Sequence, residues 1–376
     1  MAGLNVYTSN RLEILVKKLA KTVQTPLPAP LAPEIIVVQS RGMERWISMA
    51  LAELNGVSAN CSFPFPNAFL EDIFKELMPD LPDVSPFDPE IMTFRLMKII
   101  PRCTGEKGFE DLNSYLAEDP DHLRLYQLAG RIADLFDQYQ VFRPQLLFQW
   151  ERSKEEKKPP DVWQARLWRE LIRGNEKLHR ARLRENLLDQ IKNLRLDPVR
   201  LPARVSLFGI SHLPLFHLQA FAELSRLIEV NLFLIDPCRE YWADIISDRE
   251  IKKIRRKNPQ VGENIEWYHF EKGNRLLAAM GTLGRDFFEL ISGLDCEIIE
   301  NFEEPQQDSL LSCLQADILN LRDREINRVH GPTGSASDHK MGSGLIPATH
   351  QLSDPDTSVQ VHSCHSPMRE IEVLHD

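Results

Sequence analysis

The chain has 376 residues, which is long for one ordinary domain and indicates two or three. Hydrophobic residues make up 43% and charged residues 27%, as in soluble globular proteins, and no run approaches the roughly 18 apolar residues that span a bilayer. The net charge of −10 argues against a protein that coats nucleic acid with its whole surface, although a locally basic channel remains compatible with it. Six scattered cysteines without a CxxC pair, and no secretory signal, predict a cytoplasmic protein with reduced thiols.

The amino-terminal residues predict a strand at 5–8, a turn at 9–11 and a helix at 12–20. A phosphate-binding loop would lie between such a strand and helix. It needs several glycines, so that the backbone can wrap the phosphates, followed by Lys and Ser or Thr. The turn Ser9-Asn10-Arg11 holds no glycine, and no Lys-Ser/Thr pair opens the helix. The sequence therefore predicts that no nucleotide cofactor binds here.

A second requirement of ATP hydrolysis, a strand that ends in acidic residues to hold Mg²⁺, is also missing. The strand predicted at 204–210 runs into Ser211 and His212, without a carboxylate. Asp236 ends the next strand, but a single Asp before Pro237 is typical of a turn at a strand end. We expect this chain to lack ATPase activity. No pattern of carboxylates typical of a nuclease is recognisable either.

Continuous apolar runs predict strands that are buried on both faces, as in a parallel sheet covered by helices. These runs lie at residues 34–40, 204–210, 230–236 and 358–363. Between residues 67 and 196 the pattern is helical, with helices predicted at 67–78, 88–100, 109–118, 122–141, 161–174 and 180–195. The simplest architecture is an α/β domain formed by residues 1–66 and 198–325, interrupted by an all-helical insertion at 67–197.

The carboxyl-terminal part predicts a linker followed by the start of another domain. Residues 326–357 are rich in Gly, Ser and Pro and have no hydrophobic periodicity, which is typical of a flexible linker. Ser366, Pro367 and Glu370 then form a strong helix start. Because the chain ends within two turns of that start, we expect residues 358–376 to open a truncated second domain of a longer protein.

Two segments carry side chains suited to DNA contact. Gln39 lies at the end of the predicted strand at 34–40, and Arg41 and Arg45 follow it; these side chains can reach base edges or phosphates. Asp134, Asp137 and Gln138 fall on one face of a helix, where carboxylates can accept from cytosine and glutamine can pair with adenine. The alternative is structural in both cases: the charged residues form solvated helix faces, and neighbouring aromatic residues such as Trp46 belong to the core.

Two other features are weaker candidates for function. Basic residues gather in the segment 163–195 and again in 249–257, but solvated helix faces would explain both unless they converge in space. His362, Cys364 and His365 could contribute to a metal site, yet no second cluster with matching spacing accompanies them. We therefore predict no metal site.

Several separate segments resemble the N-terminal third of the RecC family, the gamma chains of bacterial exodeoxyribonuclease V. These segments are YTSNRLEIL, IIVVQSRGMERW, FPFPNAF, ADLFDQYQVFRP, LFGISHLP, DPCREYW and VHSCHSPMREIEVLHD. The resemblance implies a catalytically degenerate fold related to superfamily 1 helicases. In it, the sheet domain is the 1A-like part, the helical insertion is the 1B-like part, and the segment from residue 358 begins a 2A-like part.

The resemblance also implies a function. RecC chains are non-catalytic subunits of a helicase–nuclease that acts in double-strand break repair by homologous recombination. Their RecB and RecD partners supply ATP and Mg²⁺ chemistry, while RecC scaffolds the complex, guides the 3′-ending single strand and scans it for the Chi hotspot. Two alternatives stay open from the residues: an active nucleotide-dependent helicase domain with unusual motifs, and a pure protein-interaction scaffold.

The family's hotspot-reading residues map onto the two segments already singled out. Carried over to this chain, the implied DNA-binding residues are Gln39, Arg41, Arg45, Asp134, Leu135, Asp137, Gln138 and Arg143, with Arg180 added from the basic helix of the insertion. An exposed Tyr139 or Phe142 could stack on an unpaired base, which is worth about 1–3 kcal/mol where it occurs.

Overall fold

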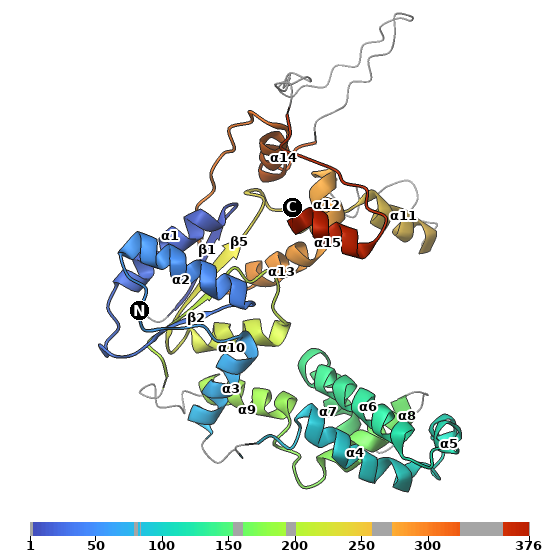
Figure 1. Cartoon of the computed structure of the whole chain (residues 1–376). Helices are drawn as coiled ribbons and strands as arrows, with labels where there is room; N and C mark the ends of the chain where they lie inside the picture. The colour runs from blue at the N-terminus through green and yellow to red at the C-terminus, as the bar shows by residue number, and fades with distance from the viewer. Residues whose placement is uncertain are drawn as a thin grey trace, which may run out of the picture. The chain divides into compact units, whose positions relative to one another are not determined.

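The computed structural model describes residues 3–78, 82, 84–152, 161–192, 201–257, 273–323 and 356–375 (Figure 1). The strands are β1 (Gly3–Ser9), β2 (Glu34–Val37), β3 (Cys61–Ser62), β4 (Arg204–Phe208), β5 (Glu229–Ile235) and β6 (Glu297–Glu300). The helices are α1 (Leu12–Gln24), α2 (Arg41–Asn55), α3 (Pro66–Leu77), α4 (Pro89–Cys103), α5 (Glu110–Leu116), α6 (Leu123–Phe142), α7 (Pro144–Arg152), α8 (Asp161–Ile172), α9 (Arg180–Lys192), α10 (Leu215–Leu224), α11 (Asp248–Lys257), α12 (Arg275–Met280), α13 (Thr282–Ser292), α14 (Leu310–Leu319) and α15 (Pro367–His375).

The strands form one six-stranded sheet in the order β3-β2-β4-β5-β1-β6. Strand β2 pairs in parallel with β3 and β4, and β4 pairs in parallel with β5. Every residue of β4 is buried, as are the five central residues of β5. The continuous apolar runs thus correctly predicted an α/β fold with a parallel sheet.

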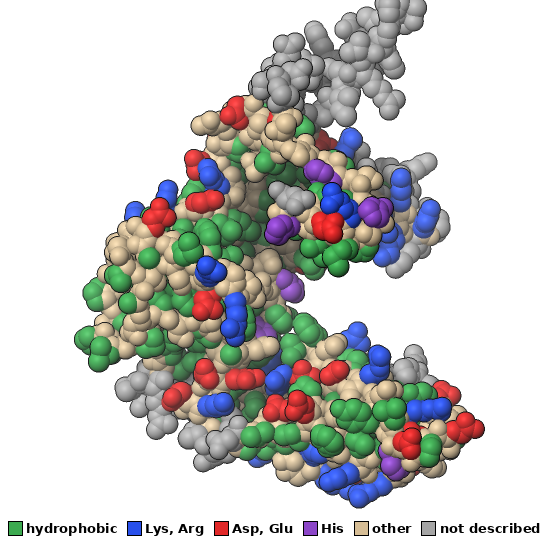
Figure 2. Space-filling view, in the orientation of Figure 1, with side chains coloured by type: hydrophobic (Ala, Val, Ile, Leu, Met, Phe, Trp, Pro, Cys, Tyr) green, Lys and Arg blue, Asp and Glu red, His purple; other side chains and the backbone are tan. Residues whose placement is uncertain are grey.

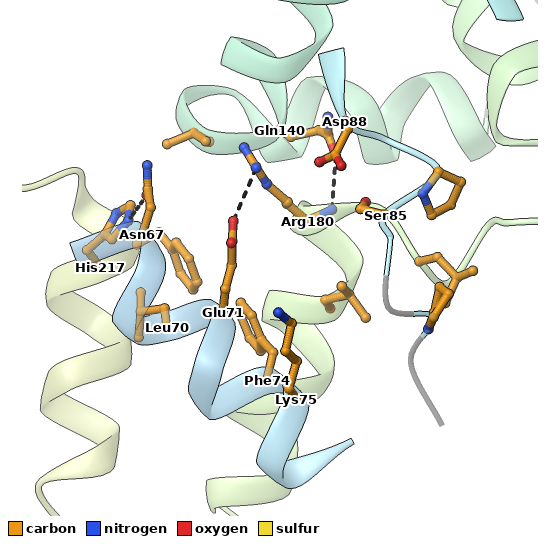
Figure 3. Close-up of a pocket in the computed structure, with 16 residues that line it drawn as sticks. Asn67, Leu70, Glu71, Phe74, Lys75, Ser85, Asp88, Gln140, Arg180 and His217 are labelled. Carbon is orange, nitrogen blue, oxygen red and sulfur yellow. Dashed lines mark hydrogen bonds and ion pairs between the residues drawn. The ribbon is translucent and has the colours of Figure 1, made fainter. Parts of the chain in front are cut away.

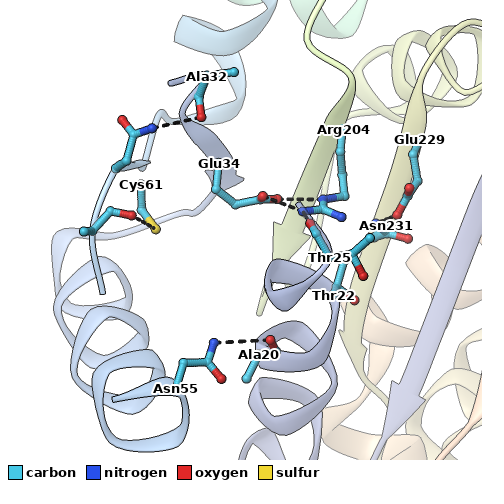
Figure 4. A network of polar contacts seen from close by, with 12 residues as sticks. Ala20, Thr22, Thr25, Ala32, Glu34, Asn55, Cys61, Arg204, Glu229 and Asn231 are labelled. Carbon is cyan, nitrogen blue, oxygen red and sulfur yellow. Dashed lines mark hydrogen bonds and ion pairs between the residues drawn. The ribbon is translucent and has the colours of Figure 1, made fainter. Parts of the chain in front are cut away.

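A buried ion pair joins two of these strands (Figure 4). Glu34 begins β2 and Arg204 begins β4, and their side chains are only 7% and 4% exposed. The guanidinium donates to both carboxylate oxygens, at 2.8 and 2.6 Å, and to the carbonyl of Thr25 at 3.0 Å. Because the two charges are buried together, each compensates the loss of water around the other.

Contacts divide the chain into two compact units. Unit 1 comprises Met1–Val6, Val16–Phe233 and Leu294–Glu297. Unit 2 comprises Tyr7–Leu15, Leu234–Gly293 and Ile298–Asp376. The predicted domain boundaries, at 66–67 and 197–198, follow a different criterion and stay a prediction.

The helices of unit 1 between α4 and α9 surround their own aromatic core. Phe136 of α6 lies 5.4 Å from Trp168 of α8, centroid to centroid, and Phe87 lies 5.9 Å from the same indole ring. All three side chains are fully buried. Among the described residues from 66 to 192 the structure has helices and no strand, so the helical pattern of this segment was predicted correctly, within a few residues at each end.

Unit 2 has a smaller core around Trp242, which packs with Cys238, Ile245 and Leu277. The carboxylate of Asp236, just after β5, accepts hydrogen bonds from the Trp242 indole at 3.0 Å and from the Cys238 amide at 3.2 Å. Asp236 is 4% exposed, and burial raises its pKa to about 7. It therefore acts as the turn residue that its position before Pro237 predicts.

The strand predicted at residues 358–363 is wrong, whereas the helix predicted after it is confirmed. Residues 358–363 form no strand; Val361 is 94% exposed there, and apolar alternation alone makes no strand where the segment pairs with no described neighbour. The helix after it does begin at Pro367, and the Ser366 hydroxyl accepts from the Arg369 amide at 3.3 Å.

The predicted linker lies outside the described residues, except for 356 and 357. No helix in the described ranges is long and apolar enough to cross a membrane.

Candidate nucleic-acid interface

Arg180 joins three helices of unit 1 through its side chain and backbone (Figure 3). Its guanidinium lies 2.7 Å from the carboxylate of Asp137 on α6 and 3.2 Å from that of Glu71 on α3. Its backbone amide donates to the side-chain oxygen of Gln140 at 2.9 Å. The structure thus brings together two of the predicted site residues, Asp137 and Arg180, which lie 43 positions apart in the sequence.

Asp137 is half-buried in this arrangement, and its neighbours pull its pKa in opposite directions. Burial raises the pKa of the carboxyl and is the largest effect, Arg180 lowers it, and the nearby carboxylates of Asp134 and Asp88 raise it. The net direction is upward. A carboxylate held this way favours a partner that offers a hydrogen-bond donor, such as the amino group of a base, over a phosphate.

The other predicted residues of α6 are accessible to different extents. Asp134 and Gln138 are exposed and Leu135 is half-buried. Tyr139 is engaged in the core, since its ring lies 5.9 Å from that of Trp150 and its hydroxyl donates to Gln164 at 3.4 Å. It therefore is not free to stack on a base, whereas Phe142 is 63% exposed and keeps that possibility.

Arg143 ends α6 in an exposed position, with its guanidinium 5.5 Å from the centre of the Tyr139 ring. Such a cation–π contact orients the side chain without neutralising it. The charge therefore remains available to a phosphate.

Gln39, Arg41 and Arg45 lie at the start of α2, beside the sheet. Ser40 caps this helix, since its hydroxyl accepts from the Met43 amide at 3.1 Å. Gln39 donates to the carbonyl of His212 at 2.7 Å, which fixes its amide in an exposed position. Arg41 and Arg45 are exposed, and neither has an ion pair with a described residue.

The two predicted groups lie in different parts of unit 1. Figure 1 shows α2 beside the sheet and α6 among the helices from α4 to α9, with α3, α9 and α10 between them. The structure therefore does not bring Gln39, Arg41 or Arg45 into contact with the predicted residues of α6. Their grouping into one DNA-binding site stays a prediction.

Most arginines of the basic segment 163–195 are neutralised by acidic neighbours. Arg166 pairs with Glu106 and Glu170, which raise its pKa, and Arg182 pairs with Glu151 and Glu185. Arg184 lies 4.1 Å from the centre of the Phe216 ring, and burial lowers its pKa to about 10. These contacts favour the structural explanation of the segment over a continuous phosphate track.

Three residues around Arg180 were not predicted: Glu71, Gln140 and His217. They line a cavity of about 160 Å³ together with Arg180 (Figure 3). His217 is 3% exposed and contacts the Asn67 side-chain oxygen at 2.6 Å, and burial lowers its pKa to about 4, so the ring is neutral at pH 7. No local sequence signal could have found these residues, because their contacts join segments 40 to 150 positions apart.

The turn at residues 9–11 is covered by another segment of unit 2. The Asn301 amide donates to the Thr8 carbonyl at 2.9 Å, and the Ser9 hydroxyl donates to the Asn301 carbonyl at 2.8 Å. Asn10 and Glu303 exchange two hydrogen bonds, at 2.9 and 3.0 Å. The loop is therefore tied to residues 301–303 through a carbonyl, a hydroxyl and a side-chain amide, and the Arg11 backbone amide donates to the Ser9 hydroxyl at 3.1 Å.

The cavity beside this turn is acidic. Its volume is about 680 Å³, and the carboxylates in its lining are those of Glu13, Glu303, Glu304 and Asp308. Arg11 is the one Lys or Arg in this lining, and it lies 3.5 Å from Glu13 and from Glu303. The lining therefore carries charge of the same sign as a triphosphate.

In the segment with His362, Cys364 and His365, the ring of His362 contacts the side chain of Gln360 at 3.2 Å. Within the described ranges, no group of three or more His, Cys, Asp or Glu is arranged to hold a metal ion.

Comparison with known proteins identifies the family. A model described as the RecC N-terminal domain matches residues 4–321. The RecBCD enzyme subunit RecC of Escherichia coli K12 is 37% identical, over 99% of this chain and 35% of that protein. The corresponding subunit of Haemophilus influenzae is 32% identical, over 99% of this chain and 36% of its own length, and that of Mycobacterium tuberculosis H37Rv is 29% identical, over 100% and 32%. The chain thus spans about a third of the length of these relatives, and it belongs to the RecC family as a counterpart of its N-terminal domain.

Proposed function

We propose that this chain is the N-terminal part of a RecC-type subunit that handles DNA without hydrolysing ATP. The observation that carries the proposal, beside family membership, is the turn at residues 8–10 that residues 301–303 cover. In a superfamily 1 helicase fold, this turn is where the nucleotide phosphates would bind. Here the Thr8 carbonyl, the Ser9 hydroxyl and the Asn10 side chain bond to residues 301–303, and the adjoining cavity is acidic.

The proposed role in the complete protein is to guide the 3′-ending single strand and to recognise the Chi hotspot. Exposed Arg41, Arg45 and Arg143 would hold phosphates, because each is free of carboxylate partners among the described residues. The Asp137–Arg180 pair, with Asp134 and Gln138 on the same helix, would test the bases by hydrogen bonding. Gln39 and Leu135 would contribute to the same surfaces.

The proposed setting is a RecBCD-type exodeoxyribonuclease V in the cytoplasm, acting in double-strand break repair by homologous recombination. RecB-like and RecD-like subunits would supply ATP, Mg²⁺ and nuclease chemistry. The relatives are described as subunits of the RecBCD enzyme, which supports this assignment.

A nucleotide titration tests the non-catalytic part of the proposal. Thermal unfolding of this chain is followed at rising Mg-ATP concentration, with a RecB-like subunit as the positive control. Because a ligand that binds only the folded state raises the melting temperature, we expect a rise for the control and none for this chain. A saturable rise for this chain would instead favour an active nucleotide-dependent domain.

A further inference from the structure

Two aromatic side chains lie exposed next to each other on the helices α4 and α6. Phe94 is 61% exposed and Tyr126 is 50% exposed, and their ring centroids are 6.4 Å apart at an interplanar angle of 42°. Leu123, one turn before Tyr126, is 58% exposed. Figure 2 shows hydrophobic side chains along the face where α4 and α6 lie, with both basic and acidic side chains at its borders. Contiguous exposed apolar side chains of this kind are typical of a binding surface.

The α6 helix also lacks a side chain beside this pair. Gly130 follows Tyr126 by one turn in the interior of a 20-residue helix. Glycine lowers helix stability relative to alanine, and no described residue lies within 4 Å of a Cβ built at this position. Packing against the described part of the chain therefore does not explain the glycine. It leaves an open place on the helix next to the Tyr126 ring.

Three exposed basic residues of α4 and α6 accompany the pair, together with one exposed acidic residue, Glu90, one turn before Phe94. Lys98 follows Phe94 by one turn on α4, Arg102 follows by two, and Arg131 adjoins Gly130 on α6. All three are exposed, and none has an ion pair with a described residue, unlike Arg166, Arg180 and Arg182. We call Phe94, Tyr126, Gly130, Lys98, Arg102 and Arg131 the aromatic strip.

We propose that the aromatic strip binds single-stranded nucleic acid through its bases and phosphates. Bases would stack on Phe94 and Tyr126 and occupy the open space at Gly130. The side chains of Lys98, Arg102 and Arg131 would contact phosphates. The inference rests on the proposed DNA-handling function and extends it, because Asp134 and Gln138 continue the same face of α6 at four and eight residues from Gly130. Unpaired cations beside flat rings fit a nucleic acid; an acidic protein segment would need the cations but not the rings.

The test is fluorescence anisotropy of labelled oligothymidine titrated with the whole 376-residue chain. We expect the double substitution Phe94→Ala and Tyr126→Ala to weaken binding about 30-fold or more without changing the salt slope, since stacking involves no ions. Lys98→Ala and Arg131→Ala should together reduce that slope by about 1.4. Gly130→Leu covers the open place while favouring the helix, so it should weaken binding in a protein that stays folded by circular dichroism. Leu283→Ala, at a 68% exposed position on α13, is the control and should leave binding unchanged.

Three results would overturn the inference, and they are distinguishable. If Arg41→Ala weakens binding but the aromatic double substitution does not, the strip is wrong while the proposed function stands. If the unsubstituted chain fails to bind oligothymidine at low salt, both fail for this chain. If polyglutamate competes equally with oligothymidine and its binding survives the loss of the rings, the strip is a site for an acidic protein instead.

Discussion

Asp236 is a buried acid whose ionisation opposes folding. Its pKa is about 7 in the folded protein, against about 3.9 for an unperturbed aspartate. Because the folded pKa is raised, the contribution of this carboxyl to stability is complete below about pH 4. This contribution is lost as the pH rises through about 7, because the buried carboxyl then loses its proton and the folded state holds a buried negative charge.

Asp236→Asn should therefore change the pH dependence of stability. The amide oxygen can still accept from Trp242 and Cys238, and it cannot ionise. Relative to the parent chain, the variant should gain about 3–4 kcal/mol in free energy of unfolding between pH 4 and pH 8. Urea unfolding at the two pH values measures this. A difference between variant and parent that stays constant with pH would show that Asp236 does not titrate in this range.

Substitution of Asp137 should affect base recognition and leave binding to the DNA backbone unchanged. Asp137→Ala removes the carboxylate that contacts Arg180 and leaves the exposed arginines in place. In a complete RecBCD-type complex we expect the response to the hotspot to change while the unwinding rate stays the same. The matched control is Asp121→Ala, another acid of the helical segment, which is exposed. Unwinding that falls in step with hotspot response would remove the support for a sequence-reading role.

The residue types at the site followed from the sequence, but their partners did not. The spacing of Asp134, Asp137 and Gln138 correctly placed them on one helix. Glu71 and Gln140 complete the surroundings of Arg180 only because α3, α6 and α9 meet in the fold. A contact between positions 109 apart, such as that of Arg180 and Glu71, leaves no periodic pattern in one sequence.

At the scale of elements, the ion pair between Glu34 and Arg204 holds two neighbouring strands. Glu34→Gln would leave a buried guanidinium without its counter-charge, and breaking a buried pair from one side costs about 3–5 kcal/mol. We expect that loss in the free energy of unfolding, measured with urea. Glu372→Gln, in the exposed pair with Arg369, is the control and should cost about 0.5 kcal/mol or less. Equal effects of the two substitutions would contradict the structural role of the buried pair.

Long periodic elements were predictable, and short ones were not. The helices α3 to α6, α8 and α9 have an apolar side that repeats over several turns, so their existence followed from the sequence. The strands β3 and β6 have two and four residues, and β6 reads Glu-Ile-Ile-Glu, so pairing with a neighbour and not composition makes them strands. The segment 358–363 shows the opposite case. It has the composition of a strand, but it forms none because it has no described neighbour with which to pair.

At the scale of the whole molecule, the arginines divide into those that pair with carboxylates and those that do not. The chain carries a net charge of −10, and many of its arginines are bound to carboxylates. Those that stay free among the described residues include Arg41, Arg45, Arg143 and the cations of the aromatic strip. An acidic protein can bind DNA through such a limited set of contacts, and its affinity should then fall steeply with salt.

The most direct test of a DNA-handling chain without ATP chemistry is the anisotropy of labelled single-stranded DNA, titrated with this chain at two salt concentrations and without nucleotide. We expect salt-sensitive binding that weakens on Arg41→Ala and on Arg143→Ala, each reducing the salt slope by about 0.7, with no effect of added Mg-ATP. Absence of binding at low salt, or binding that requires Mg-ATP, would contradict this account. The first result would favour a protein-interaction scaffold and the second an active helicase domain.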